Sequence, residues 1–213
     1  MKKEKEPIDN TKVIITPPNF KTILFRIGGT APLVIHKFGQ KAREQMMTDQ
    51  EKGSKKKARG AAKPPKDFDE CYNQARHISA EGWDGICASA FKAAMVDACV
   101  SAGFFKTRGR ISFFILQDGA DAEDGTPLVK IIGKPKPHDH MVTIGQGKRD
   151  IRRRPMYDPW EVQLQIRYDA DVFDETSIAN LIFRAGIGGV GEGRPTSKNS
   201  VGMGWGTFTI LNK

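Results

Sequence analysis

Alternating apolar and polar positions predict two long strands. In residues 20–29 the apolar face is Ile23, Phe25 and Ile27, and the other face is Thr22, Leu24 and Arg26. In residues 160–170 the inward positions are Val162, Leu164, Ile166 and Tyr168, and the outward ones are Glu161, Gln163, Gln165 and Arg167. The second strand is therefore expected to bury one face and to keep the other polar and solvated.

Apolar residues at helical spacing predict two helices. In residues 89–103 the stripe is Ala90, Phe91, Ala94, Met95, Ala98, Cys99 and Ala102. Ser89 is the expected cap and Gly103 the expected left-handed C′ residue. In residues 174–186 the stripe is Ile178, Leu181, Ile182 and Ala185. This helix has an acidic first turn, with Arg184 in its last turn and Gly186 as its expected end.

Shorter elements complete the pattern. Strands are expected at residues 110–118, 128–132, 140–144 and 205–211, and short helices within 41–52 and 67–77. The order strand, helix, strands, strand, helix, strand is the split βαβ pattern of ferredoxin-like domains. We therefore expect an α+β fold with a ferredoxin-like or RRM-like βαββαβ core in a single domain over residues 1–213. Helices would cover one face of an antiparallel sheet and leave the other open, although no aromatic RNP motif of the RNA-recognition module is found.

Composition narrows the class of protein. The chain has 213 residues, of which 38% are hydrophobic and 28% are charged. No apolar run reaches the length of a membrane span, and the lysine-rich start has no apolar stretch behind it, so a cytoplasmic location is expected. Cys71, Cys87 and Cys99 are odd in number and lack CxxC spacing, which argues against a disulfide framework and a structural zinc site. Reduced, mostly packed thiols are expected.

The positive charge is local. The formal net charge is +9, and residues 41–66 hold nine Lys/Arg against three Asp/Glu, while residues 148–154 hold five against one. The rest of the chain is close to neutral. Such clusters suit a polyanion, nucleic acid above all, and the alternative is a merely solvated run of charges.

Glycine gathers near the C-terminus. Eight of the 22 glycines lie between positions 186 and 206, in a segment, residues 185–208, that also holds Arg194 and Lys198. Exposed backbone amides with a few cations are suited to holding phosphates. The alternative is a long flexible connection.

Two motifs carry a resemblance to a family. The turn GGTAPLVIHKF (residues 28–38) and the ending GGVGEGRPTSKNSVGMGWGTFTI (residues 188–210) resemble the RAMP superfamily, which contains the RNA-binding backbone and RNA-processing subunits of CRISPR systems. Small phage-encoded proteins share the PL turn, a lysine-rich insertion and this ending. The resemblance implies a ferredoxin-like core whose glycine loop and insertions grip a single-stranded nucleic acid, often in many copies along the strand. The chain lacks the second ferredoxin-like half of some members, which weakens the processing-nuclease interpretation.

The sequence thus predicts a non-enzymatic protein that binds single-stranded RNA or DNA. The backbone contacts are expected from Lys52, Lys55, Lys56, Lys57, Arg59, Lys63, Arg149, Arg152, Arg153, Arg154, Arg194 and Lys198, with base stacking on Tyr157, Trp160 or Trp205. The alternative is a metal-independent endoribonuclease with His36 as general base and Lys37 stabilising charge. A third possibility is an interaction protein that docks on a larger nucleic-acid complex.

No cofactor is expected. The glycines match neither a Walker loop nor a dinucleotide fingerprint. His138 and His140 flank Asp139 without a distant third ligand, so no metal site is expected. The basic insertions at 39–66 and 133–155 are expected to be mobile arms that order on binding, giving a homo-oligomer or filament along the strand.

Overall fold

A computed structural model describes residues 16–53, 65–144, 148–197 and 203–211. These ranges contain five helices and eleven strands. The strands form three sheets, in which all neighbouring strands are antiparallel. The protein is therefore of the α+β class, as expected. None of the helices in the described ranges has the length and apolar content that a bilayer crossing requires.

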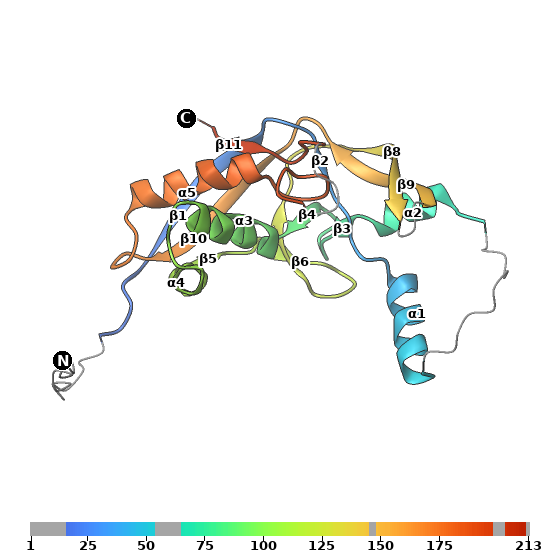
Figure 1. Ribbon diagram of the computed structural model, residues 1–213, viewed down its shortest axis with the longest axis horizontal. Coiled ribbons are helices and arrows are strands. Elements are labelled where there is room, and N and C mark those ends of the chain that lie inside the picture. The colour runs from blue at the N-terminus through green and yellow to red at the C-terminus, as the bar shows by residue number, and fades with distance from the viewer. Residues whose placement is uncertain (1–15, 54–64, 145–147, 198–202, 212–213) are drawn as a thin grey trace, which may run out of the picture.

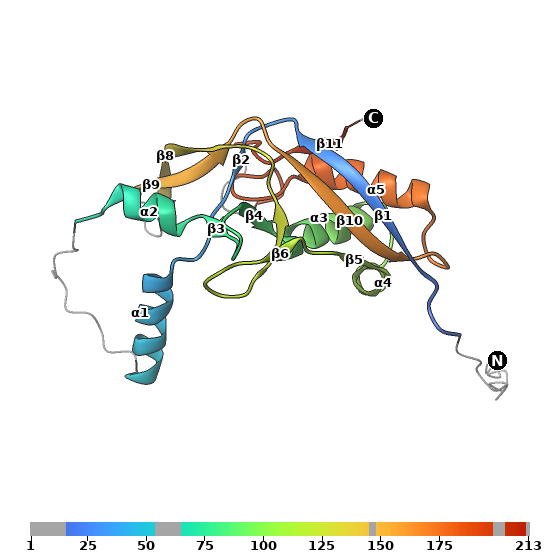
Figure 2. The same cartoon turned by 180° about the vertical axis from the view of Figure 1, so that it is seen from behind.

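The main sheet has the order β11-β1-β10-β5, with β11 at Phe208–Ile210, β1 at Phe20–Gly29, β10 at Glu161–Asp169 and β5 at Phe113–Ile115. The long pair β1 and β10 runs in register from Phe20 opposite Asp169 to Gly28 opposite Glu161. Helices α3 (Ala88–Ser101) and α5 (Glu175–Gly188) lie over one face of this sheet (Figure 1). From behind, β1 and β10 lie in front of both helices, so this face of the sheet points away from them (Figure 2).

The core forms between the sheet and these two helices. The four inward residues of β10 are buried, as the alternation predicted, and so are all four apolar stripe residues of α5. Phe91 and Met95 of α3 are each 1% exposed and belong to the same cluster. The outward residues Gln163, Gln165 and Arg167 are exposed, which confirms the two-faced strand.

Two smaller sheets lie beside the main one. One has the order β3-β4-β7-β6, with β3 at His77–Ile78, β4 at Asp84–Cys87, β7 at Pro127–Lys130 and β6 at Gly119–Ala120. The other has the order β2-β9-β8, with β2 at Leu33–Val34, β9 at Lys148–Tyr157 and β8 at Pro135–Ile144. Strands β8 and β9 are ten residues each and form a hairpin.

The two basic insertions differ from each other. The described part of the segment 133–155, expected to be a mobile arm, is largely this β8–β9 hairpin, and Pro135, Pro137 and Pro155 lie within the paired strands. The segment 39–66 contains the expected short helix, α1 (Gln40–Glu51), which projects from the body (Figure 1). A second short helix, α2 (Phe68–Gln74), follows as predicted.

Among the boundaries that differ from the sequence prediction, three have a local structural reason. The strand expected at 110–118 starts late because α4 (Lys106–Ser112) precedes β5, and the Ser112 hydroxyl donates to the carbonyl of Arg108 within that helix. Cys87 rather than Ser89 is the N-cap of α3, because β4 runs directly into the helix. Helix α5 continues through Gly186 to Gly188, and the residue with positive φ is Gly189. Gly103 has the positive φ expected after α3.

Replacing Gly186 with alanine is expected to destabilise the protein, although alanine is the better helix former. A Cβ at this position would lie 2.0 Å from the carbonyl oxygen of Phe208 in β11. Forcing the two elements apart is expected to cost about 2 kcal/mol or more in the free energy of unfolding, measured by urea titration. The matched control is Gly188→Ala, whose nearest neighbour is the methyl group of Thr196 at 3.1 Å. Equal stability of the two variants would contradict this packing.

Candidate functional site

The glycine-rich segment after α5 is hydrogen-bonded to the turn after β1. The N–H of Gly206 donates to the carbonyl of Pro32 at 2.7 Å, and the N–H of Glu192 donates to that of Val34 at 2.9 Å. The Val190 N–H donates to the Gly206 carbonyl at 3.0 Å. Gly206 has φ of 68°, and a Cβ there would lie 1.8 Å from the Val190 carbonyl oxygen, so only glycine fits. The described part of this segment, residues 185–197 and 203–208, is thus held in place and is not a loose connection. It is called the glycine-rich platform below.

The β8–β9 hairpin lies against this platform. Arg154 of β9 is 4% exposed and forms an ion pair with Glu192. The Trp205 ring meets the rings of His138 and His140 edge-on, with centroid distances of 5.3 and 5.4 Å. A buried ion pair and an aromatic cluster therefore hold the hairpin to the glycine-rich segment.

A cleft of about 1020 Å³ lies among the hairpin, the platform and helix α3. Helix α3 contributes alanines, whose short side chains leave room beside the helix. The hairpin contributes Arg152, Met141 and His140, and the platform contributes backbone at 189–192. The chemically active or charged residues of the lining are His36, His77, Cys87, Asp97, His140, Arg152, Glu192, Arg194 and Trp205.

The cleft keeps an excess of positive charge. The charge of Glu192 is balanced by Arg154, so Asp97 is the remaining carboxylate among its lining residues. Arg152 and Arg194 provide two guanidinium groups, both partly exposed, and Nε of Arg152 lies 3.9 Å from the Asp150 carboxylate. The Arg194 side chain donates to the carbonyl of Gly191 at 2.9 Å, which fixes its position on the platform. A guanidinium group held in place in this way is suited to oxyanions such as phosphate.

His140 lies in this wall and stays neutral at pH 7. Burial, followed by the positive charges of Arg154, His138 and Arg152, lowers the pKa of His140 from 6.5 to about 4, against the opposing effect of Asp139. On acidification the unfolded chain binds a proton at His140 near pH 6.5, whereas the folded chain binds it only near pH 4. Protonation therefore favours the unfolded chain, and stability is lost as the pH falls from 6.5 towards 4.

The free energy of unfolding is therefore expected to fall by up to about 3 kcal/mol over that interval because of His140. Urea titrations at pH 7 and pH 4.5 measure the loss, and His140→Gln is expected to show a smaller one. If His140→Gln lost as much unfolding free energy between pH 7 and pH 4.5 as the wild type, the assignment of this loss to His140 would be wrong.

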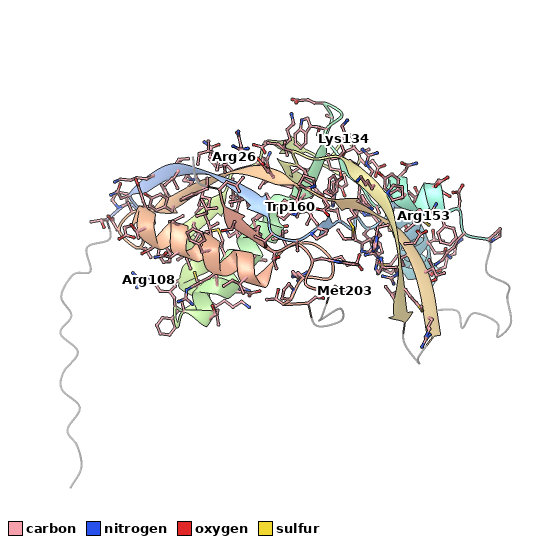
Figure 3. All side chains as sticks on the ribbon, turned by 90° about the horizontal axis from the view of Figure 1, so that it is seen from above. Arg26, Arg108, Lys134, Arg153, Trp160 and Met203 are labelled. Carbon is pink, nitrogen blue, oxygen red and sulfur yellow. The ribbon has the colours of Figure 1, made fainter. Side chains whose placement is uncertain are left out.

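The cleft brings together four of the residues predicted to bind nucleic acid or to catalyse its cleavage: His36, Arg152, Arg194 and Trp205. Arg149 and Lys52 are exposed outside its lining. Arg153 lies on the hairpin beside α2 (Figure 3), where it forms a bidentate pair with Asp139 at 2.8 Å and a contact with Asp69 at 3.0 Å. Its guanidinium group therefore joins the hairpin to α2.

Four predicted contacts are wrong because the side chains are buried. Tyr157 is 0% and Trp160 is 2% exposed, and the Trp160 indole donates to the carbonyl of Ala31 at 2.8 Å, so neither ring is free to stack on a base. Figure 3 shows Trp160 near the middle of the molecule. Arg154 is occupied by Glu192. Lys37 is 4% exposed and pairs with Asp121 at 2.7 Å, which removes it as a partner for His36.

Several sequence predictions fall outside the described residues. These are Lys55, Lys56, Lys57, Arg59, Lys63 and Lys198. Among the residues that are described, no three His, Cys, Asp or Glu side chains are placed so that they could hold a metal ion, and His138 and His140 stack on each other. Sequence reasoning weighed His140 only as a metal ligand. Its position in register opposite Arg152 is visible only once the hairpin pairing is known.

No protein-family model matches the chain, and no curated protein matches it.

Proposed function

We propose that this protein binds single-stranded nucleic acid, RNA or DNA, in the cleft between the β8–β9 hairpin and the glycine-rich platform. The observation that carries the proposal is that Arg152, Arg194 and Trp205 line one cleft together with platform backbone. Cations that meet phosphates and an aromatic ring that stacks on bases are the two parts of a single-strand site. Two segments distant in the sequence, the β8–β9 hairpin and the glycine-rich platform, supply them.

The chemistry of the cleft favours a single strand over a duplex. A base reaches the Trp205 ring only when it is not paired and stacked within a helix. The guanidinium groups of Arg152 and Arg194 neutralise phosphates without reading sequence. Binding through these groups is therefore expected to depend on the backbone and on stacking, and to tolerate many sequences.

We further propose that the core is ferredoxin-like and that the chain is a RAMP-like protein. In chain order the core strands are β1, β5, β10 and β11, with α3 after β1 and α5 after β10. In the sheet their order is β11-β1-β10-β5, so the last strand in chain order lies beside the first, followed by the third and the second. This order, together with two helices on one face, supports a split βαβ core. The hydrogen bonds from Gly206 to Pro32 and from Glu192 to Val34 join the two segments that carry the family resemblance.

The proposal includes assembly of several copies along one strand. Helix α1 projects from the body (Figure 1), with Met46 and Met47 being 50% and 60% exposed. The two exposed methionines on this otherwise polar helix are the surface that we propose contacts a neighbouring copy. Light scattering with oligonucleotides of increasing length is expected to show stepwise loading. One copy per strand at every length would leave a monomeric binder.

His36 favours one second candidate function, metal-independent RNA cleavage. Desolvation, followed by the charges of Arg154 and Arg152, lowers the pKa of His36 to about 4, so the ring is neutral at pH 7. A base beside phosphate-binding arginines is the arrangement that attack by a 2′-hydroxyl needs. RNA fragments with cyclic phosphate ends that are absent in His36→Ala would establish cleavage. Intact RNA with both proteins supports binding alone.

The proposed function is tested by fluorescence anisotropy with one sequence in three forms: single-stranded RNA, single-stranded DNA and duplex DNA. Binding of at least one single strand, tighter than that of the duplex, is expected. A protein that binds none of the three alone would be better described as a component that docks on a larger complex.

A further inference from the structure

We propose that Cys87, His77 and Asp121 form a nucleophilic thiol site for acyl transfer, with esters or thioesters as the substrate class. The Cys87 sulfur lies 3.3 Å from Nε2 of His77, and Nδ1 of the same ring lies 2.8 Å from Oδ2 of Asp121. A nucleophile, a base and a carboxylate that orients the base, joined in this order, are the three parts of a covalent catalyst. The inference does not depend on the binding of nucleic acid.

The second sheet places these residues. His77 begins β3 and Cys87 ends β4, its antiparallel neighbour. Asp121 follows β6 and is bridged to Ser79, the residue after β3. The three side chains come from positions 77, 87 and 121 and have no motif spacing, so no local pattern indicated them.

Asp121 is fixed as a carboxylate. It is 3% exposed, and its Oδ1 accepts from the ammonium group of Lys37 at 2.7 Å and from the N–H of Glu123 at 3.0 Å. Burial raises the pKa of Asp121, but the hydrogen bonds from Lys37, Glu123 and His77 outweigh it and hold the pKa below its usual value. A carboxylate facing Nδ1 keeps the proton on that nitrogen, so the lone pair of Nε2 is directed at the Cys87 sulfur.

The thiol is accessible from the cleft. Cys87 and His77 both line it, and Cys87 is partly exposed. Cys87 is also the N-cap residue of α3, and its side chain makes no capping hydrogen bond. The helix therefore places its positive N-terminal end beside the sulfur, where charge on a carbonyl oxygen would develop.

The reaction balances without a further reagent. The sulfur attacks the acyl carbon and its proton passes to Nε2 of His77, so the S–C bond forms while the carbonyl electrons move to oxygen. Collapse breaks the bond to the leaving alcohol or thiol, which takes the proton from Nε2. Water, deprotonated by the same nitrogen, then releases the acid and regenerates the Cys87 thiol.

Cys87 differs from the other two cysteines in its exposure. Cys71 is exposed on α2, and Cys99 is 0% exposed in the core. Cys71 is therefore an internal reference for an ordinary thiol, and Cys71→Ser removes it without touching the cleft.

The experiment treats the full-length protein with p-nitrophenyl acetate. We expect an initial release of about one equivalent of p-nitrophenolate, with the acetyl group found by mass spectrometry on Cys87 in preference to Cys71. Cys71→Ser is expected to react as the wild type does, while His77→Gln is expected to slow acylation about 100-fold.

Acetylation of Cys71 in preference to Cys87 in the wild type would overturn the inference without any variant. Equal acylation rates of Cys87 in wild type and in a folded His77→Gln protein would also overturn it, leaving a buried polar network that only holds the small sheet together. Neither outcome bears on nucleic-acid binding, since no nucleic acid is present in the assay.

Discussion

Trp160→Ala is expected to lower the free energy of unfolding by about 3–5 kcal/mol, because the indole is fully packed in the core. The ring lies 6.2 Å from that of Phe208 and donates to Ala31, and a Cβ on Gly29 would lie 2.1 Å from its nitrogen. For a chain of this size the melting temperature should fall by about 10 °C. Thermal unfolding followed by circular dichroism measures the change.

Trp205→Ala is the matched variant, and the opposite pattern is expected from it. Its ring is partly exposed at the cleft, so it should lose about 1–3 kcal/mol of binding free energy for each base stacked on it, with a smaller loss of stability. If Trp160→Ala proved as stable as the wild type, or if Trp205→Ala bound single strands with full affinity, the division into core ring and binding ring would be wrong.

Replacing both cleft arginines, Arg152→Gln with Arg194→Gln, is expected to weaken single-strand binding by about 100-fold. Each guanidinium group that meets a phosphate contributes roughly 1.5–3 kcal/mol, and part of the loss is recovered by water. Both side chains are partly exposed, and neither replacement opens the core. Anisotropy titration at fixed salt measures the difference.

The control removes the same charge from the open face of the main sheet, through Arg26→Gln with Arg167→Gln. That face is a competing surface, since Arg167 lies over the rings of Phe20 and Phe114 at 5.0 and 5.3 Å. The control should retain affinity within about threefold, because net charge alone has a small effect at physiological salt. A larger loss from the control than from the cleft variant would move the binding site to the open sheet.

Local patterns predicted the core elements well. The strict alternation of residues 160–170 and the stripe of 174–186 each specify a buried face, and both elements form with those faces inward. Boundaries were less predictable where tertiary contacts decide them. Gly186 resembles a helix end in sequence, yet it continues the helix because the backbone of Phe208 packs where a Cβ would stand.

The candidate site was predictable only in part, because the sequence does not say which long-range partners are engaged. Arg153 and Arg154 look like free cations in a basic run, but carboxylates from α2, β8 and the platform pair with them. Trp160 and Tyr157 read as exposed aromatics at a strand end, but they fill the space between the turn after β1 and the core. The cleft itself arises from hairpin docking, which no local pattern encodes.

The salt dependence of single-strand affinity tests the central claim most directly. If about five phosphates are neutralised, the slope of log K against log salt should be roughly −3.5 for a single strand, and about 1.4 shallower when Arg152 and Arg194 are both replaced. The measurement is an anisotropy titration of a single-stranded oligonucleotide from 50 to 300 mM salt, with the matched duplex beside it. A slope near zero, or tighter binding to the duplex, would contradict the account.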